Sequence, residues 1–209
     1  MKFDSDFKEA ISQLPSKEKD KLILRLLKQN PILADRLYFQ LLSGDSVLDR
    51  RVKMEKRVME EVKRMSDTFY SPGYLLVDMR YLSGEITEHV KITKDKYGEA
   101  SLNLLMLNEV LRLNEKKLLD YKSSKAYTLG IYIIARTFKI LLLIKALHED
   151  FIVDFEDGLK SLSELIGNNP FLMGLAIDNG LDINWLYRSE IPEDIVSIHK
   201  ELRENGYLR

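Results

Sequence analysis

Between residues 125 and 148 the chain is apolar on almost every side of a helix. On a helical wheel its polar side chains fall into one narrow stripe with i+3/i+4 spacing, formed by Lys125, Thr128, Tyr132, Arg136 and Lys139. A helix that is hydrophobic nearly all round belongs in the middle of a fold. A membrane span would need about 20 apolar residues with few or no charges, and Arg136, Lys139 and Lys145 interrupt this run. The pattern therefore predicts a central bundle helix that other helices cover.

Apolar residues elsewhere recur at helical spacing, and no segment alternates with period 2 for long enough to predict a strand. The prolines lie at or just before proposed helix starts, where a missing N–H group costs nothing. We therefore predict an all-α fold of roughly ten helices around helix 125–148, with no β-sheet. Gly84 is predicted to end a helix that begins at Tyr74, and Gly98 to kink the chain before a helix from Glu99 to Tyr121.

Two regions are predicted along the chain. The short joint at Asn30-Pro31 favours an antiparallel helical hairpin, which places a helical hairpin region in residues 1–44. Residues 45–209 are predicted to form a helical bundle or array, either as a second domain or as one domain continuous with the first.

The bulk composition narrows the classes of partner. The net charge of the 209 residues is -1, which gives no electrostatic case for nucleic acid or an anionic membrane. Cysteine is absent, which excludes disulfides, thiolate chemistry and zinc–thiolate sites. The N-terminal residues show neither the basic region nor the apolar region of a signal peptide. We expect a cytoplasmic protein whose partner is another protein or a second copy of itself, with no nucleic acid and no membrane.

One group of polar residues has the spacing of a metal site. Glu85, Glu88 and His89 stand at i, i+3 and i+4 and share one helical face. Two carboxylates and an imidazole can bind Mg²⁺ or Mn²⁺. Further candidates follow in the chain, with Asp95 as a metal ligand and Lys91 and Lys94 as phosphate-binding residues. The alternative is that the acidic residues lie in the first turn of a helix, where the helix dipole favours them, on a solvated face.

A second acidic group follows His148 at the predicted end of the central helix. Glu149 and Asp150 would meet the unfavourable end of the helix dipole there. Such local conflicts concentrate at functional sites, although solvated side chains are the simpler interpretation. Arg136 and Lys139 need partners if they are buried, and we expect internal salt bridges rather than an anion site. His199 is expected to be an ordinary surface residue.

Three segments carry a resemblance to known proteins: Tyr70-Ser-Pro-Gly-Tyr, Ser83-Gly-Glu-Ile-Thr-Glu-His-Val-Lys-Ile-Thr-Lys-Asp-Lys-Tyr-Gly-Glu and Ile144-Lys-Ala-Leu-His-Glu-Asp. Over nearly its whole length the chain resembles a family of uncharacterised all-helical bacterial proteins, some of which carry the transferred label deoxyuridine triphosphate nucleotidohydrolase. All-helical nucleotide pyrophosphohydrolases hold Mg²⁺ with a Glu-x-x-Glu pair on one helix and a Glu-x-x-Asp pair on a following helix. Glu85-Ile-Thr-Glu88 matches the first pair, and the second pair is missing. The remaining ligands would have to come from elsewhere, such as Asp95, Glu149 or Asp150.

Two functions from different classes stay open. The absence of a complete catalytic motif favours a non-catalytic helical scaffold or interaction protein that needs no cofactor. The alternative is an all-α pyrophosphohydrolase of the dUTP type that depends on Mg²⁺ or Mn²⁺ and uses the acidic residues named above.

Overall fold

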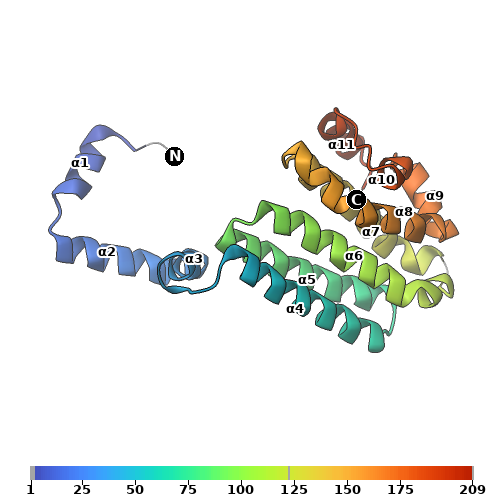
Figure 1. The fold of residues 1–209 in the computed structure, drawn as a ribbon, viewed down its shortest axis with the longest axis horizontal. Helices are drawn as coiled ribbons and strands as arrows, with labels where there is room; N and C mark the ends of the chain where they lie inside the picture. The colour runs from blue at the N-terminus through green and yellow to red at the C-terminus, as the bar shows by residue number, and fades with distance from the viewer. Residues whose placement is uncertain (1–2, 122, 209) are drawn as a thin grey trace.

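The all-α fold is confirmed. A computed structural model of the chain describes residues 3–121 and 123–208, and these contain eleven α-helices, one 3₁₀ helix and no β-strand (Figure 1). In chain order they are α1 (Ser5–Gln13), α2 (Ser16–Gln29), α3 (Pro31–Leu42), α4 (Val47–Asp67), α5 (Pro72–Thr93), α6 (Lys96–Leu119), α7 (Ser123–Lys145), the 3₁₀ helix η1 (Glu149–Phe155), α8 (Glu156–Gly167), α9 (Pro170–Asp178), α10 (Asn184–Tyr187) and α11 (Ile195–Glu204).

The body of the molecule is a helical array with α7 at its centre. The long helices α4, α5 and α6 lie side by side, and α7 packs on α5 and α6 (Figure 1). The shorter helices α9 and α11 pack on other parts of α7. Ile133, Ile134 and Phe138 of α7 are completely buried. Because burying one such side chain contributes about 1.5–3 kcal/mol, α7 is a main source of stability.

The apolar character of α7 is explained by this burial. Ser124–Lys145 is the one described segment that is long and apolar enough to cross a membrane, and 56% of its most apolar window is buried inside the fold. Helices from both halves of the chain cover it. The segment therefore has the surroundings of a bundle core helix, as the sequence pattern predicted.

Three predicted helix boundaries are wrong. Helix α5 continues through Gly84, and α6 begins at Lys96, so that Gly98 lies in its first turn and makes no kink. A glycine inside a helix costs only about 1 kcal/mol relative to alanine, and the burial of Leu82 and Ile86 on either side of Gly84 outweighs that cost. The central helix ends at Lys145 rather than at residue 148.

The N-terminal helices differ from the predicted hairpin. Helix α2 runs across the view of Figure 1 while α3 is seen end-on, so the two helices do not lie antiparallel. Helix α3 packs against α5. Helices α1 and α2 extend away from the body, and we call these two helices, residues 5–29, the N-terminal arm.

Candidate functional site

The first predicted metal ligands lie on the outer side of α5. Glu85 is 43% exposed and forms an ion pair with Arg57 of α4, with Oε2 3.2 Å from Nε. Glu88 is exposed. Because α5 is continuous from Pro72, both carboxylates lie far from its first turn, and the helix dipole does not explain them. His89 is half-buried, and its Nε2 atom is buried and has no hydrogen-bond partner among the described residues. Burial lowers the pKa of His89, and the positive charges of Arg50 and Arg51 act in the same direction.

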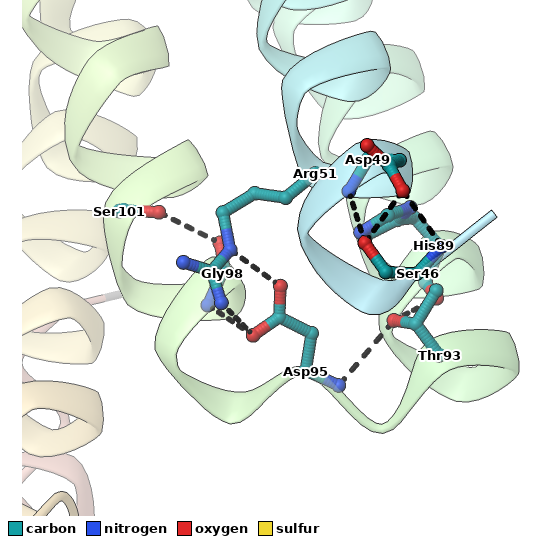
Figure 2. A network of polar contacts seen from close by, with 8 residues as sticks. All are labelled: Ser46, Asp49, Arg51, His89, Thr93, Asp95, Gly98 and Ser101. Carbon is teal, nitrogen blue, oxygen red and sulfur yellow. Dashed lines mark hydrogen bonds and ion pairs between the residues drawn. The ribbon is translucent and has the colours of Figure 1, made fainter.

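Asp95 belongs to a network of polar contacts that joins α4, α5 and α6 (Figure 2). Its carboxylate is 4% exposed and accepts two hydrogen bonds from Arg51, at 2.6 Å from Nε and 2.7 Å from Nη2. It also caps α6 by accepting a hydrogen bond from the Gly98 backbone N–H at 2.8 Å. The Asp95 backbone N–H donates to Thr93 Oγ1 at 3.3 Å. These contacts occupy the carboxylate, and they raise the pKa of Arg51 above its ordinary value.

Gly98 makes this arrangement possible. A Cβ atom at this position would lie 2.2 Å from Asp95 Oδ2 and 3.2 Å from Arg51 Nε. Arg51 also makes a cation–π contact with Tyr97, whose ring centre lies 4.4 Å from the guanidinium carbon. The network therefore fixes the junction of three helices, and Asp95 has a structural role.

Lys91 and Lys94, the predicted phosphate-binding residues, are exposed at the C-terminal end of α5. Lys94 is the C-cap residue, with a left-handed backbone at φ 61°. The carbonyl groups at a helix C-terminus carry partial negative charge. This end of α5 therefore attracts the two cations and does not favour a phosphate.

The acidic residues after the central helix have different surroundings from those predicted. Glu149 and Asp150 are exposed and lie in the first turn of η1, not at the end of α7. His148 is the N-cap of η1, and its Nδ1 is 3.1 Å from Asp150 Oδ2. The predicted conflict with a helix dipole is absent because a helix start favours acidic residues.

The structure does not bring the six predicted metal ligands together in one site. Across residues 3–121 and 123–208, no group of three or more His, Asp or Glu side chains is placed so that it could hold a metal ion. Asp95 is bound to Arg51, and Glu85 is paired with Arg57. The arrangement thus gives the predicted Mg²⁺ or Mn²⁺ site no support.

A different polar site lies between α5, α7 and α11. It is an open groove of about 560 Å³, which we call the basic groove, lined by Ser83, Thr87, Tyr132, Ala135, Arg136, Lys139, Leu142, His199 and Arg203. This lining contains three cationic side chains and no carboxylate. Three of its residues belong to the polar stripe that the sequence shows on the otherwise apolar helix 125–148. That stripe is the signal by which the sequence points to the groove.

The two cations of α7 that were predicted to form internal salt bridges, Arg136 and Lys139, are both half-buried and behave differently. Lys139 Nζ is 3.0 Å from Glu99 Oε1, which confirms the prediction for this residue. Arg136 makes no ion pair with any residue that the structure describes, and its guanidinium donates to Asn103 Oδ1 at 3.0 Å and to the Tyr132 hydroxyl at 2.6 Å. Both partners are neutral. Within the described part of the chain, no carboxylate therefore compensates the positive charge of Arg136.

His199 is not the ordinary surface residue that the sequence led us to expect. Its ring is half-buried and packs 5.7 Å from the ring of Phe138, a core residue of α7. Burial lowers the pKa of His199, and the nearby charge of Arg203 lowers it further. The last helix thus brings an imidazole with a lowered pKa and a second arginine to the groove beside α7.

Comparison of this chain with models of protein families, with characterised proteins and with solved structures gives no match.

Proposed function

We propose that this protein is a non-catalytic, cytoplasmic helical interaction protein that assembles with a second copy of itself through its N-terminal arm. The observation that carries the proposal is the exposure of the arm. Neither α1 nor α2 contains a buried residue. Five large apolar side chains of the arm are nevertheless exposed: Phe7 48%, Ile11 39%, Ile23 50%, Leu24 60% and Leu26 50%.

An amphipathic helix normally gains its stability by burying its apolar face. Helix α2 contacts α3 at one end and does not lie on the body (Figure 1). Its apolar side chains therefore lack the cover that the remainder of the chain provides for α4 to α9. Exposed apolar surface of this kind marks a protein–protein interaction site.

A second copy of the chain offers a complementary surface. Helix α2 carries five basic and two acidic residues, which gives it a net charge of +3. Residues 149–157, which we call the acidic face, carry five exposed carboxylates and no basic residue. The same segment exposes Phe151 by 43% and Val153 by 63%. Basic charge beside apolar residues on α2 thus matches acidic charge beside apolar residues on the acidic face.

The pyrophosphohydrolase alternative gains no comparable support, because the described residues do not bring three acidic or imidazole ligands together. Its test is a thermal-shift titration with Mg²⁺ or Mn²⁺ and dUTP. A metal-dependent shift that disappears in Glu88→Gln would favour the enzyme over the interaction protein.

The proposed self-association is tested by light scattering coupled to size-exclusion chromatography over a range of protein concentrations. We expect a dimer whose dissociation constant rises by at least about tenfold, or about 1.4 kcal/mol, when Leu24 and Leu26 are both replaced by Asp. Raising the salt concentration should weaken the dimer, since exposed charges are screened. Val196→Asp on α11, which also replaces an exposed apolar residue (63%), is the matched control and should leave the dimer unchanged.

The acidic face is tested separately by Phe151→Ser with Val153→Ser. This change should weaken the dimer in the same way as the change in α2. A chain that is monomeric at every concentration would overturn the proposal, and so would a dimer that neither pair of substitutions affects.

A further inference from the structure

We infer that the basic groove binds a small phosphate monoester and that the Arg136 guanidinium hydrogen-bonds the phosphate group. The groove lies on the body of the molecule and is separate from the N-terminal arm and from the acidic face. The inference is therefore independent of the proposed self-association.

The charge balance of the groove is the first argument. Arg136 is half-buried and loses part of its hydration, while the oxygens that replace water belong to Asn103 and Tyr132 and carry no net charge. Buried charges are ordinarily paired with an opposite charge, and a cation that has lost part of its hydration is therefore stabilised by a nearby anion. Among the described residues, none of those that line the groove carries a carboxylate. An anion bound in the groove would supply the negative charge that the neutral partners of Arg136 do not provide.

The kinds of donor in the groove indicate which anion fits. A guanidinium presents several N–H groups in a planar fork that matches the oxygens of a phosphate. Hydroxyl groups from Ser83 and Thr87 on α5 and from Tyr132 on α7 belong to the same lining. The Thr87 hydroxyl already donates to the Ser83 carbonyl oxygen at 2.8 Å, which leaves the Ser83 and Tyr132 hydroxyls and the Arg136 guanidinium as donors. Donors from two helices in different directions suit the tetrahedral oxygens of phosphate better than the two coplanar oxygens of a carboxylate.

The size and the apolar part of the groove favour an ester over free phosphate. Its volume of about 560 Å³ lies within the range of about 300–1,000 Å³ that is typical of small-molecule sites. Ala135 and Leu142 provide apolar surface beside the cations. The groove can therefore accommodate an organic group next to the phosphate.

The experiment is an NMR titration of the full-length protein at constant ionic strength with glycerol 3-phosphate, inorganic phosphate and acetate. The ring resonance of His199, assigned with a His199→Gln variant, reports on the groove, and that of His148 serves as an internal reference outside it. We expect glycerol 3-phosphate to bind at least as tightly as inorganic phosphate and more tightly than acetate. Binding should raise the pKa of His199, because the anion stabilises the imidazolium.

Two variants test the assigned geometry. Arg136→Met should raise the dissociation constant for glycerol 3-phosphate by at least about tenfold. Ala135→Phe should have a similar effect by filling the groove without changing its charge, and it keeps the test valid if Arg136→Met does not fold. Arg112→Met is the control, because Arg112 pairs with Glu109 on α6 and does not line the groove.

The inference is overturned if neither phosphate compound shifts the His199 resonance. Equal affinity for acetate and glycerol 3-phosphate would overturn the assignment to phosphate, and clearly tighter binding of inorganic phosphate would overturn the assignment to an ester. Binding that is unchanged in both Arg136→Met and Ala135→Phe would show that the ligand lies elsewhere.

Discussion

Replacing Asp95 by alanine should destabilise the protein far more than replacing any other of the predicted metal ligands. The change removes both hydrogen bonds to Arg51 and the cap on the Gly98 N–H. Breaking a buried ion pair costs about 3–5 kcal/mol. Arg51 retains 18% exposure, and water therefore relieves part of its unpaired charge, which places the cost near 3 kcal/mol. Loss of the N-cap adds about 1 kcal/mol.

The expected loss is thus about 4 kcal/mol of unfolding free energy. For a chain of 150–250 residues each kcal/mol lowers Tm by about 2–4 °C, so Tm should fall by about 8–16 °C. The assay is thermal and urea-induced unfolding followed by circular dichroism. Glu85→Ala is the matched control, because the pair of Glu85 (43% exposed) and Arg57 (48% exposed) is worth less than about 1 kcal/mol.

A double-mutant cycle isolates the ion pair within this loss. Arg51→Met alone leaves the Asp95 carboxylate buried without its partner, and the double variant removes both charges. The double variant should therefore be less destabilised than the sum of the two single variants. If Asp95→Ala costs no more than Glu85→Ala, or if the two substitutions in the cycle are additive, the assigned role of the network is wrong.

Three further predictions concern glycine and histidine positions. Gly84→Ala should stabilise the protein by about 0.4–1 kcal/mol in urea unfolding, because α5 is continuous there and no atom lies within 4 Å of the added Cβ; destabilisation would mean that the helix ends at this glycine. Gly98→Ala should cost about 1–3 kcal/mol, since its Cβ would lie 2.2 Å from Asp95 Oδ2, and a Tm equal to that of the parent protein would contradict the network geometry. The free energy of unfolding should fall as pH drops through 6.5, because His89 takes up a proton near that pH in the unfolded chain while its pKa in the folded chain is lower. Urea unfolding at pH 5.5 and 7.5 measures this change, and His89→Leu should make the difference between the two pH values smaller.

Local features of the sequence were enough to predict most of the fold. The helix starts at Asn30-Pro31 and Asn169-Pro170 follow from interactions within a single turn. In each, the asparagine side chain accepts a hydrogen bond from a backbone N–H, and the proline stands where a backbone N–H would have no partner in the helix. The nearly all-round apolar pattern of helix 125–148 predicted a buried helix for an equally local reason. Gly84 misled the prediction because its cost of about 1 kcal/mol is smaller than the packing of the helix on either side.

The roles of the candidate site residues depended on contacts between helices. Asp95 was predicted to be a metal ligand because its neighbours in the sequence do not include its partner. That partner, Arg51, lies 44 residues away along the chain. His199 resembled a surface residue because the Phe138 ring that covers it belongs to another helix. The spacing of residues along one helix specifies which side chains share a face, but not what that face meets.

The sequence by itself therefore determined the all-helical class, several helix starts with their caps and the central position of α7, since these depend on interactions within a few residues. The tertiary structure alone decided that Asp95 forms an ion pair with Arg51. It also decided that, among the residues it describes, no carboxylate pairs with Arg136 and no helix of the body covers the arm. Each of these depends on whether a distant helix supplies an opposite charge or an apolar surface, and that is set by the packing of the whole chain.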